Sequence, residues 1–504
     1  MTREVDQPLQ ENCGIAAAIA PSGVDASPIA AKLAYELQHR GQEGGGIGSK
    51  KVGGSFSVLR AGQRFGQAFS SPNIFRIALG HTRYRTTGPS DDSDYAQPIY
   101  VDSDDRSLMG IHNGNLANFT ELHEQLKSAG VSLKTENKVD NDGSLVPVSD
   151  SEVLFNRIAR ASGEDWPSRV IRAMEGVEGA VSAVIATDQD QMIAFRDPWG
   201  IRPLSFGRLN GHWVVASETT PLDKLGVVDQ TEIDKGEMWI FESDKDPQRL
   251  VYDGSRPKRF CDFEDWYFSW PASRRNGKEE ELIREACGYF LAQEEIVSGR
   301  LVDADLVTSV PDTGRSSAVT FAEALQLSYR DRVYKERYDD KGGRGFIGSN
   351  PLLRAGIMDD KYLYSSSLAG KVVYLVDDTG VRLETIKIIS QTLKERVGVR
   401  QAHIRFSAPK FVRPCFLGVN IHNRSELGAV EFRNGLWVVK SNEQIAQEIG
   451  ADSVAFLTMA GRRRVREYFG ESVHDFCGYC HGDEGPNFDW LKYDPDILLE
   501  QYNH

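Results

Sequence analysis

The sequence predicts two architectures in tandem, an α+β sandwich of stacked layers followed by an α/β domain with a parallel sheet. In residues 14 to about 245, short apolar or β-branched runs such as 181–186 lie between Gly-rich turns. Strands grouped with only a few helices are typical of an α+β domain. From about residue 280 the order becomes strand, loop, helix, as at 305–310 and 371–376. This alternation favours a parallel sheet covered by helices.

Length, composition and charge exclude several classes of protein. The 504 residues suggest about two to four domains, and 40% hydrophobic with 26% charged residues is typical of a globular chain. The formal net charge of −14 argues against a nucleic-acid partner, because phosphate binding needs clustered Lys and Arg. No apolar run approaches the roughly 20 residues of a membrane span. Residues 1–12 also lack the apolar stretch of a secretory signal, so we expect a cytoplasmic protein.

Cys13 is the first candidate for catalysis, because it opens a Cys-Gly-Ile-Ala run behind a short polar leader. If residues 1–12 are a propeptide that is removed, Cys13 gains a free α-amino group. This amine has an ordinary pKa near 8 and can act as general base toward the thiol of the same residue. The alternative interpretation is a buried cysteine at the start of a strand.

Four further cysteines are candidates for a metal centre. Cys477 and Cys480 form a CxxC, and Cys261 and Cys415 lie beside aromatic residues far upstream. In a chain without a signal peptide, CxxC indicates metal or redox work more often than a structural disulfide. Four thiolates can hold zinc or an iron–sulfur cluster, and spacing alone does not decide between them. The sixth cysteine, Cys287, is expected to be a buried core residue.

A candidate anion site follows the apolar run 371–376. Two aspartates, Asp377 and Asp378, come directly after it, and a helix is expected from Ile386 onward. A strand, a short loop and a helix N-terminus bind anions readily, because backbone N–H groups and the helix dipole face the ligand.

The chain carries a series of motifs at residues 37–43, 80–84, 96–98, 112–116, 149–152 and 196–204. Their order and spacing resemble the class II glutamine amidotransferases and, within them, the amidophosphoribosyltransferases of purine synthesis. The resemblance covers nearly the whole chain. It implies an N-terminal nucleophile (αββα) domain at 13–245, a phosphoribosyltransferase-type parallel-sheet domain at 260–450, and a C-terminal segment at 451–504 that carries cluster ligands.

The resemblance implies a role for each residue of a glutamine site. Cys13 attacks the glutamine side chain and releases ammonia. An arginine offers a planar fork for a carboxylate, and a tetrahedral oxyanion needs prearranged donors. Arg40, Arg83, Thr86 and Asp150 would accordingly bind glutamine, and the Asn113 side chain with the Gly114 N–H would bind the oxyanion.

The resemblance also implies a second site, at which Asp377, Asp378, Thr379, Arg382 and Thr385 bind phosphoribosyl diphosphate with Mg²⁺. The loop departs from the family pattern at three positions, where Gly380 replaces Ile, Leu383 replaces Gly and Glu384 replaces Thr. Leu383 adds bulk where close backbone approach is expected. A Glu384 carboxylate about 4 Å from the phosphate would cost about 4 kcal/mol per charge pair. We therefore expect this site to be altered or lost, unless Glu384 points outward as a helix cap.

Cofactor and assembly follow from the resemblance as well. One branch of the family has both a trimmed leader and a [4Fe–4S] cluster, and its cysteine contexts look like those of Cys261, Cys415, Cys477 and Cys480. Zinc is the lesser alternative, and a homotetramer is implied. Two other functions stay open. One is a diverged relative that aminates a different acceptor, and the other is a non-catalytic regulatory protein.

Overall fold

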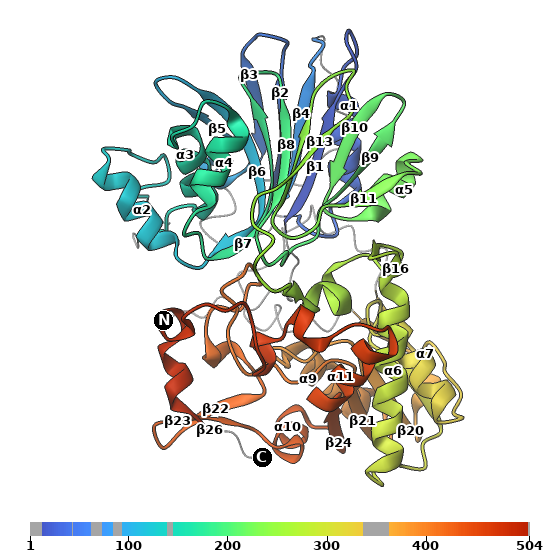
Figure 1. Ribbon diagram of the computed structural model, residues 1–504. Coiled ribbons are helices and arrows are strands. Elements are labelled where there is room, and N and C mark those ends of the chain that lie inside the picture. Colours follow the sequence, from blue (N-terminus) through green and yellow to red (C-terminus); the bar gives the residue numbers. More distant parts are fainter. Residues whose placement is uncertain are drawn as a thin grey trace, which may run out of the picture.

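The computed structural model describes residues 13–501 apart from 43, 62–72, 84–92, 139–144 and 336–361. The two expected architectures are confirmed and stack on one another (Figure 1). The blue-to-green amino-terminal half holds two large sheets, and the yellow-to-red half holds a parallel sheet. The expected propeptide, residues 1–12, lies outside the described residues.

The amino-terminal half is built on two packed sheets whose facing sides form one hydrophobic core, around Ile15, Leu79 and Ile111. The first sheet has the order β11 (Gln230–Glu232), β9 (Ser205–Leu209), β10 (His212–Ala216), β1 (Gly14–Ile19), β4 (Ile77–Arg83), β2 (Gly44–Lys50) and β3 (Phe56–Ala61). The second has the order β13 (Gln248–Val251), β12 (Glu237–Phe241), β8 (Met192–Arg196), β7 (Gly179–Thr187), β6 (Ser107–Leu116) and β5 (Ile99–Asp102).

Helices cover the outer face of each sheet and complete the αββα layers. On the first sheet these are α1 (Ser27–Glu36) and α5 (Thr219–Leu225). On the second they are α2 (Phe119–Ser128), α3 (Asp150–Arg160) and α4 (Trp166–Met174). Capping fixes where two of these helices start, because Ser149 accepts the backbone N–H of Glu152 and Asp165 accepts that of Ser168. Strands between two covered faces are apolar on both sides, as the uniformly buried β7 shows.

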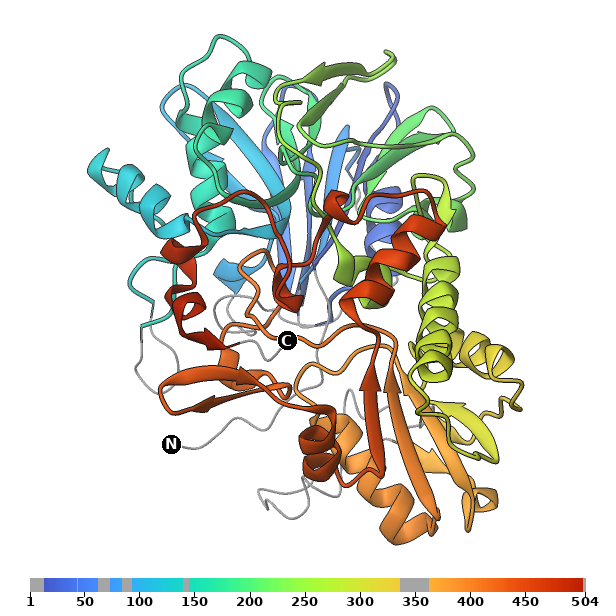
Figure 2. The same cartoon turned by 60° about the horizontal axis from the view of Figure 1, so that its bottom comes forward.

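The carboxyl-terminal half has a four-stranded parallel sheet with helices on both faces (Figure 2). Its strand order is β17 (Leu306–Ser309), β20 (Val372–Asp377), β21 (Gln401–Phe406) and β24 (Ser453–Phe456). The fourth strand lies beyond residue 450, where the sequence analysis ends this domain. One face carries α9 (Glu384–Thr392) and α10 (Asn442–Ile449), and the other carries α6 (Glu280–Val297), α7 (Arg315–Ala324) and α11 (Met459–Tyr468).

Short elements outside this sheet connect distant parts of the chain. Strand β14 (Phe260–Cys261) pairs in parallel with β25 (Phe476–Cys477), which places Cys261 beside Cys477. A π-helical turn, η2 (Glu264–Phe268), follows β14 directly. Strands β22 (Val430–Arg433), β23 (Leu436–Val439) and β26 (Glu500–Gln501) form a small sheet, while β18 (Val333–Lys335) pairs with β19 (Tyr362–Tyr364). Among the described helices, none is long and apolar enough to cross a membrane.

Candidate functional site

Cys13 stands at the start of β1, at the edge where β4 ends. Gly14 pairs with Thr82, so Arg83, the last residue of β4, comes opposite Cys13. Cys13 is partly exposed and forms no disulfide. A Cβ on Gly14 would lie 2.4 Å from Thr82 Oγ1, so glycine is needed for these strands to approach. The position fits a nucleophile held at the end of a rigid strand.

Asn113 and Gly114 lie on β6, in the second sheet. The Asn113 side chain is 2% exposed, and its Nδ2 has no hydrogen-bond partner among the described residues. An orphaned buried donor is costly unless a ligand accepts from it. Gly114 has a φ of +147°, and a Cβ there would lie 1.9 Å from Ala180 O. Its backbone is thus held in a conformation that excludes other residues.

Asp150 and Arg83, together with Arg40 described below, are the predicted glutamine ligands within the described residues. Asp150 is the first residue of α3; its Oδ2 accepts from Leu116 N at 3.1 Å and its Oδ1 from Ser151 N at 2.7 Å. Arg83 is 4% exposed, with its guanidinium 5.8 Å from the Tyr95 ring centroid. Thr86, the third predicted ligand, lies outside the described residues.

Gln97 and His112 fix the strand that carries Asn113. The Gln97 amide accepts from His112 N at 2.6 Å and donates to His112 O at 3.1 Å. Nδ1 of His112 lies 3.0 Å from Ser151 Oγ. Burial lowers the pKa of His112, so its ring is neutral near pH 7. These contacts explain the 96–98 and 112–116 motifs as a scaffold around Asn113 and Gly114, the predicted oxyanion donors.

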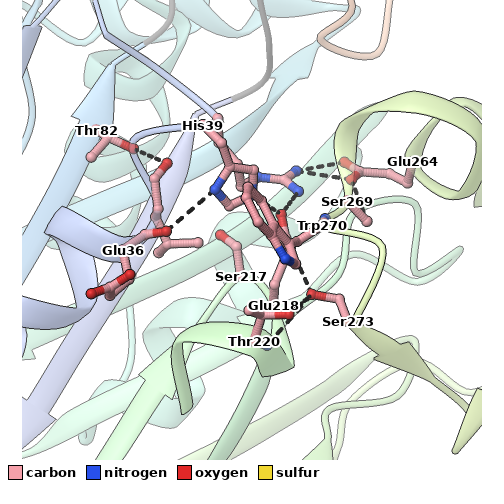
Figure 3. Close-up of polar contacts among 12 residues, drawn as sticks. Glu36, His39, Thr82, Ser217, Glu218, Thr220, Glu264, Ser269, Trp270 and Ser273 are labelled. Carbon is pink, nitrogen blue, oxygen red and sulfur yellow. Dashed lines mark hydrogen bonds and ion pairs between the residues drawn. The ribbon is translucent and has the colours of Figure 1, made fainter. Parts of the chain in front are cut away.

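Arg40 is fully buried, and its guanidinium lies between two carboxylates, those of Glu218 and Glu264 (both labelled in Figure 3). It donates to Glu218 Oε1 at 2.5 Å and to both oxygens of Glu264 at 2.8 and 2.9 Å, while its Nε donates to the backbone oxygen of Cys13 at 3.3 Å. Burial by itself would lower the pKa of Arg40, but the two carboxylates raise it above the ordinary value. All these partners belong to the protein. That Arg40 binds substrate stays a prediction. In the structure, its Nε is hydrogen-bonded to the backbone oxygen of Cys13.

The four predicted metal cysteines line a single pocket. Apolar side chains surround them, including Phe263, Phe411, Leu417 and Tyr479. Burial raises the pKa of the Cys477 thiol to about 12 and raises those of Cys261 and Cys480 as well. Among the described residues, no three His, Cys, Asp or Glu side chains are arranged so that they could hold a metal ion. The cysteines of this pocket are Cys261, Cys415, Cys477 and Cys480.

The backbone next to Cys415 contacts the 114–115 segment of β6. Phe416 O accepts from Asn115 Nδ2 at 2.8 Å. Gly418 has a φ of +100°, and a Cβ on it would lie 3.0 Å from the carbonyl carbon of Gly114. The cysteine pocket and the predicted oxyanion residue Gly114 are therefore neighbours, although they come from different halves of the chain.

In the candidate phosphate loop, Leu383 has a left-handed backbone, with φ +65° and ψ 2°. For a residue with a side chain this costs about 1–2 kcal/mol. The Leu383 side chain is 8% exposed and belongs to the core that holds Phe406 and Phe456. A Cβ on Gly380 would lie 2.8 Å from Leu383 Cδ2, and one on Gly428 would lie 2.6 Å from Leu383 Cγ. The Leu383 side chain thus packs into the core, in the space left where Gly380 and Gly428 have no side chain.

The other loop residues are only partly arranged for an anion. Asp378 is buried, and its Oδ1 accepts from Thr379 Oγ1 at 2.7 Å. Arg382 Nη2 donates to Glu426 Oε2 at 2.5 Å, which offsets its charge. Glu384 is the exposed first residue of α9, and the cap position belongs to Leu383 instead. Thr385 is half-buried in the same turn.

Sequence reasoning missed Glu218, Glu264 and Gly418. Glu264 lies in the acidic run 262–265, and such a run ordinarily indicates a solvent-exposed surface. Two fully buried arginines, Arg40 and Arg202, require acidic partners, but the sequence does not say which.

Comparison with known proteins gives consistent results. A glutamine amidotransferase domain matches residues 81–224. The amidophosphoribosyltransferase of Bacillus subtilis (strain 168) is 32% identical over 94% of this chain and 93% of its own length. That of Synechocystis sp. (strain ATCC 27184 / PCC 6803 / Kazusa) is 34% identical over 95% and 92%.

Two solved structures share the fold over nearly the whole chain. The glutamine phosphoribosylpyrophosphate amidotransferase from B. subtilis, complexed with ADP and GMP, matches with a TM-score of 0.79 and 31% identity, over 94% of this chain and 98% of that one. A structure described as the allosteric regulatory enzyme of purine biosynthesis matches with a TM-score of 0.81 and 31% identity, over 97% and 99%.

Proposed function

This chain belongs to the amidophosphoribosyltransferase family, and from that premise we propose that it hydrolyses glutamine at Cys13 and transfers the ammonia to phosphoribosyl diphosphate. The products are glutamate, 5-phosphoribosylamine and pyrophosphate, the first step of purine synthesis. The observation that carries the proposal is the placement of Cys13 opposite Arg83 where β1 begins and β4 ends, together with the buried Asn113 amide, whose Nδ2 has no partner among the described residues.

The glutaminase step needs only groups that the chain supplies. Removal of residues 1–12 frees the α-amine of Cys13, which takes the thiol proton. The sulfur attacks the glutamine amide carbon, and Asn113 Nδ2 with the Gly114 N–H stabilises the oxyanion. The amine returns the proton to the leaving ammonia, a thioester remains, and water hydrolyses it to glutamate. Asp150 and Arg83 orient glutamine through its ammonium and carboxylate.

The test of this half is trimmed protein with Cys13→Ala. We expect glutamate release by the wild type and none by the variant. Mass spectrometry of active material should show Cys13 as the first residue. Activity in the variant, or in protein with an uncut leader, would reject the assignment.

The acceptor half uses the turn between β20 and α9. Asp377 and Asp378 would hold the ribose hydroxyls and a Mg²⁺ ion would accompany the diphosphate, while the N-terminus of α9 would face the 5′-phosphate. The burial of Leu383 supports this assignment, because its side chain packs into the core. Glu384 and the tie between Arg382 and Glu426 oppose tight binding.

The acceptor assay is glutamate release with and without phosphoribosyl diphosphate, together with detection of phosphoribosylamine. We expect the ligand to raise the rate and the amine to form. No response to the ligand would favour the second candidate, a relative that aminates another acceptor, for which the altered loop residues Leu383 and Glu384 are the specific observation.

For the four cysteines we propose a structural [4Fe–4S] cluster. They share one apolar pocket, and their sequence contexts resemble those of the cluster-bearing branch of the family. The cluster would join β14, β25 and the 415–418 loop.

Metal analysis distinguishes the alternatives. We expect brown protein with about four irons per chain. Colourless protein with one zinc per chain would favour a zinc site instead of the cluster. Protein without either metal would reject both assignments. By the same resemblance, we place the enzyme in the cytoplasm as a homotetramer, which sedimentation of the trimmed protein would test.

A further inference from the structure

We infer that Glu264 is a positioning residue that couples the nucleophile Cys13 to the four-cysteine pocket. Its carboxylate accepts from two arginines at once, from Arg40 Nη2 at 2.8 Å and from Arg202 Nη1 at 3.0 Å. Each arginine reaches one of the two sites. The inference rests on the proposed function in taking Cys13 as the nucleophile.

Arg40 connects Glu264 to the nucleophile Cys13. Arg40 Nε donates to the backbone oxygen of Cys13 at 3.3 Å, and its Nη1 is held by Glu218. Glu218 is itself fixed by Trp270 N and Ser273 Oγ, each at 2.8 Å. Figure 3 shows Trp270 and Ser273 beside Glu218, and Glu264 next to Ser269. The guanidinium therefore has one orientation, and it sets the position of the Cys13 backbone.

The Arg202 arm ends at the cysteine pocket. Arg202 Nη1 lies 3.7 Å from Cys261 Sγ, and its Nη2 donates to Leu417 O at 2.8 Å. Leu417 N in turn lies 3.4 Å from Cys415 Sγ. The next residue, Gly418, is the one that packs against Gly114. Through Arg202, the pocket thus supports the oxyanion donors as well.

Burial makes this connection stiff. The side chains of Arg40, Arg202 and Glu264 are fully buried, and that of Glu218 is 1% exposed. Two positive and two negative charges balance one another here. A buried charge that loses its partner costs several kcal/mol, so each member constrains the others. If a change at the cysteine pocket moves Arg202, the Glu264 carboxylate and the Arg40 guanidinium must therefore shift with it.

The test is Glu264→Gln in the trimmed full-length protein. It keeps the shape of the side chain and removes the charge that both arginines share. We expect kcat for glutamine hydrolysis to fall by about tenfold to a hundredfold, with KM within about twofold, because Arg83 and Asp150 are untouched. Hydrogen exchange should also rise in two peptides, the one that begins at Cys13 and the one that contains residues 415–418.

The matched control is Glu295→Gln. Glu295 is just as buried and is shared by Arg405 at 2.6 Å and Arg300 at 3.1 Å, but it lies in the carboxyl-terminal half. We expect it to change neither glutaminase kcat nor exchange in the two peptides. Cys261→Ser should raise hydrogen exchange in the peptide that begins at Cys13. In the double variant with Glu264→Gln, kcat should fall by less than the product of the two single decreases, because both changes break the same connection.

Several outcomes would overturn the coupling. Unchanged kcat and exchange in Glu264→Gln would do so, and so would slower hydrolysis with normal exchange at 415–418, since Glu264 would then act on Cys13 alone. If Glu264→Gln does not fold, Arg202→Lys, which keeps the charge but loses the fork, must show the same paired changes. If the wild type hydrolyses no glutamine, the proposed function fails, and the exchange measurements decide the coupling by themselves.

Discussion

The glutamine site and the phosphate loop differ in what their polar groups contact before any substrate arrives. At the predicted glutamine site, the Asn113 amide is buried without a partner among the described residues, while the neighbouring Gln97 and His112 are held by hydrogen bonds. In the phosphate loop, Arg382 already pairs with Glu426, and Glu384 brings a negative charge to the start of α9. If the two regions bind the ligands proposed above, the first is prearranged for glutamine, whereas the second must give up contacts or overcome repulsion to bind phosphoribosyl diphosphate.

The difference teaches where this chain has diverged. Sandwich residues such as Gly14, Gly114 and Gln97 are fixed by close approach of strands, and any change there would disturb both the fold and the site. In the loop, by contrast, a large side chain at one position is replaced by a large side chain at another. Gly380 and Leu383 stand where the family pattern has Ile and Gly, and Leu383 occupies the space beside Gly380.

The strongest way to break the comparison is Asn113→Ala. If the orphaned amide is an oxyanion donor, kcat for glutamine hydrolysis should fall by about a hundredfold to a thousandfold, with little change in KM. Asn118→Ala is the control, because Asn118 is also buried near β6 but bonds to Gly176 O and Glu178 N. It should lower stability and leave kcat unchanged. Equal losses in the two variants would mean that Asn113 is only structural.

A second prediction restores the family residues in the loop with Leu383→Gly and Glu384→Thr. Removal of the carboxylate from the start of α9 should tighten binding of phosphoribosyl diphosphate by about tenfold, since an exposed like-charge pair is worth about 1 kcal/mol or somewhat more. Calorimetric titration in the presence of Mg²⁺ measures this. Glu395→Gln removes an equally exposed charge after the other end of α9 and should have almost no effect. The loop argument is wrong if the control binds as tightly as the restored protein.

A third prediction concerns the exchange of bulk. Gly380→Ile alone should overpack the core and cost about 1–3 kcal/mol of stability, because even a Cβ would lie 2.8 Å from Leu383 Cδ2 and 2.9 Å from Phe456 Cε1. Combined with Leu383→Gly, most of that cost should disappear. The midpoint of thermal unfolding reports both variants. Additive losses would show that the two positions are independent.

The smallest effect is expected from pH at Asp378. Burial raises the pKa of Asp378, and that of Asp377 is raised by burial and by Asp378. A carboxyl whose folded pKa is raised favours the fold at low pH, and stability falls as pH rises through that pKa. Asp378→Asn should therefore unfold at a higher temperature than the wild type at pH 8, and the difference should shrink as pH is lowered to 4. A constant difference would argue against ionisation as the cause.

Sequence and structure contributed differently to these two regions. The motifs predicted Cys13, Arg83, Asn113, Gly114 and Asp150 because each needs a particular residue type. The CxxC and two distant cysteines predicted the shared pocket for the same reason. The sequence did not predict that Leu383 would turn inward, because the space it fills depends on Gly428, 45 positions away along the chain.

The sequence by itself determined the two architectures and predicted the nucleophile and the cysteine set, since periodicity and side-chain chemistry are local properties. Only the tertiary structure decided which buried charges pair. Arg40, Glu264 and Arg202 come from three separate segments, and their meeting at one carboxylate depends on how the two halves pack. Buried charges must find partners, but the partner is chosen by the fold.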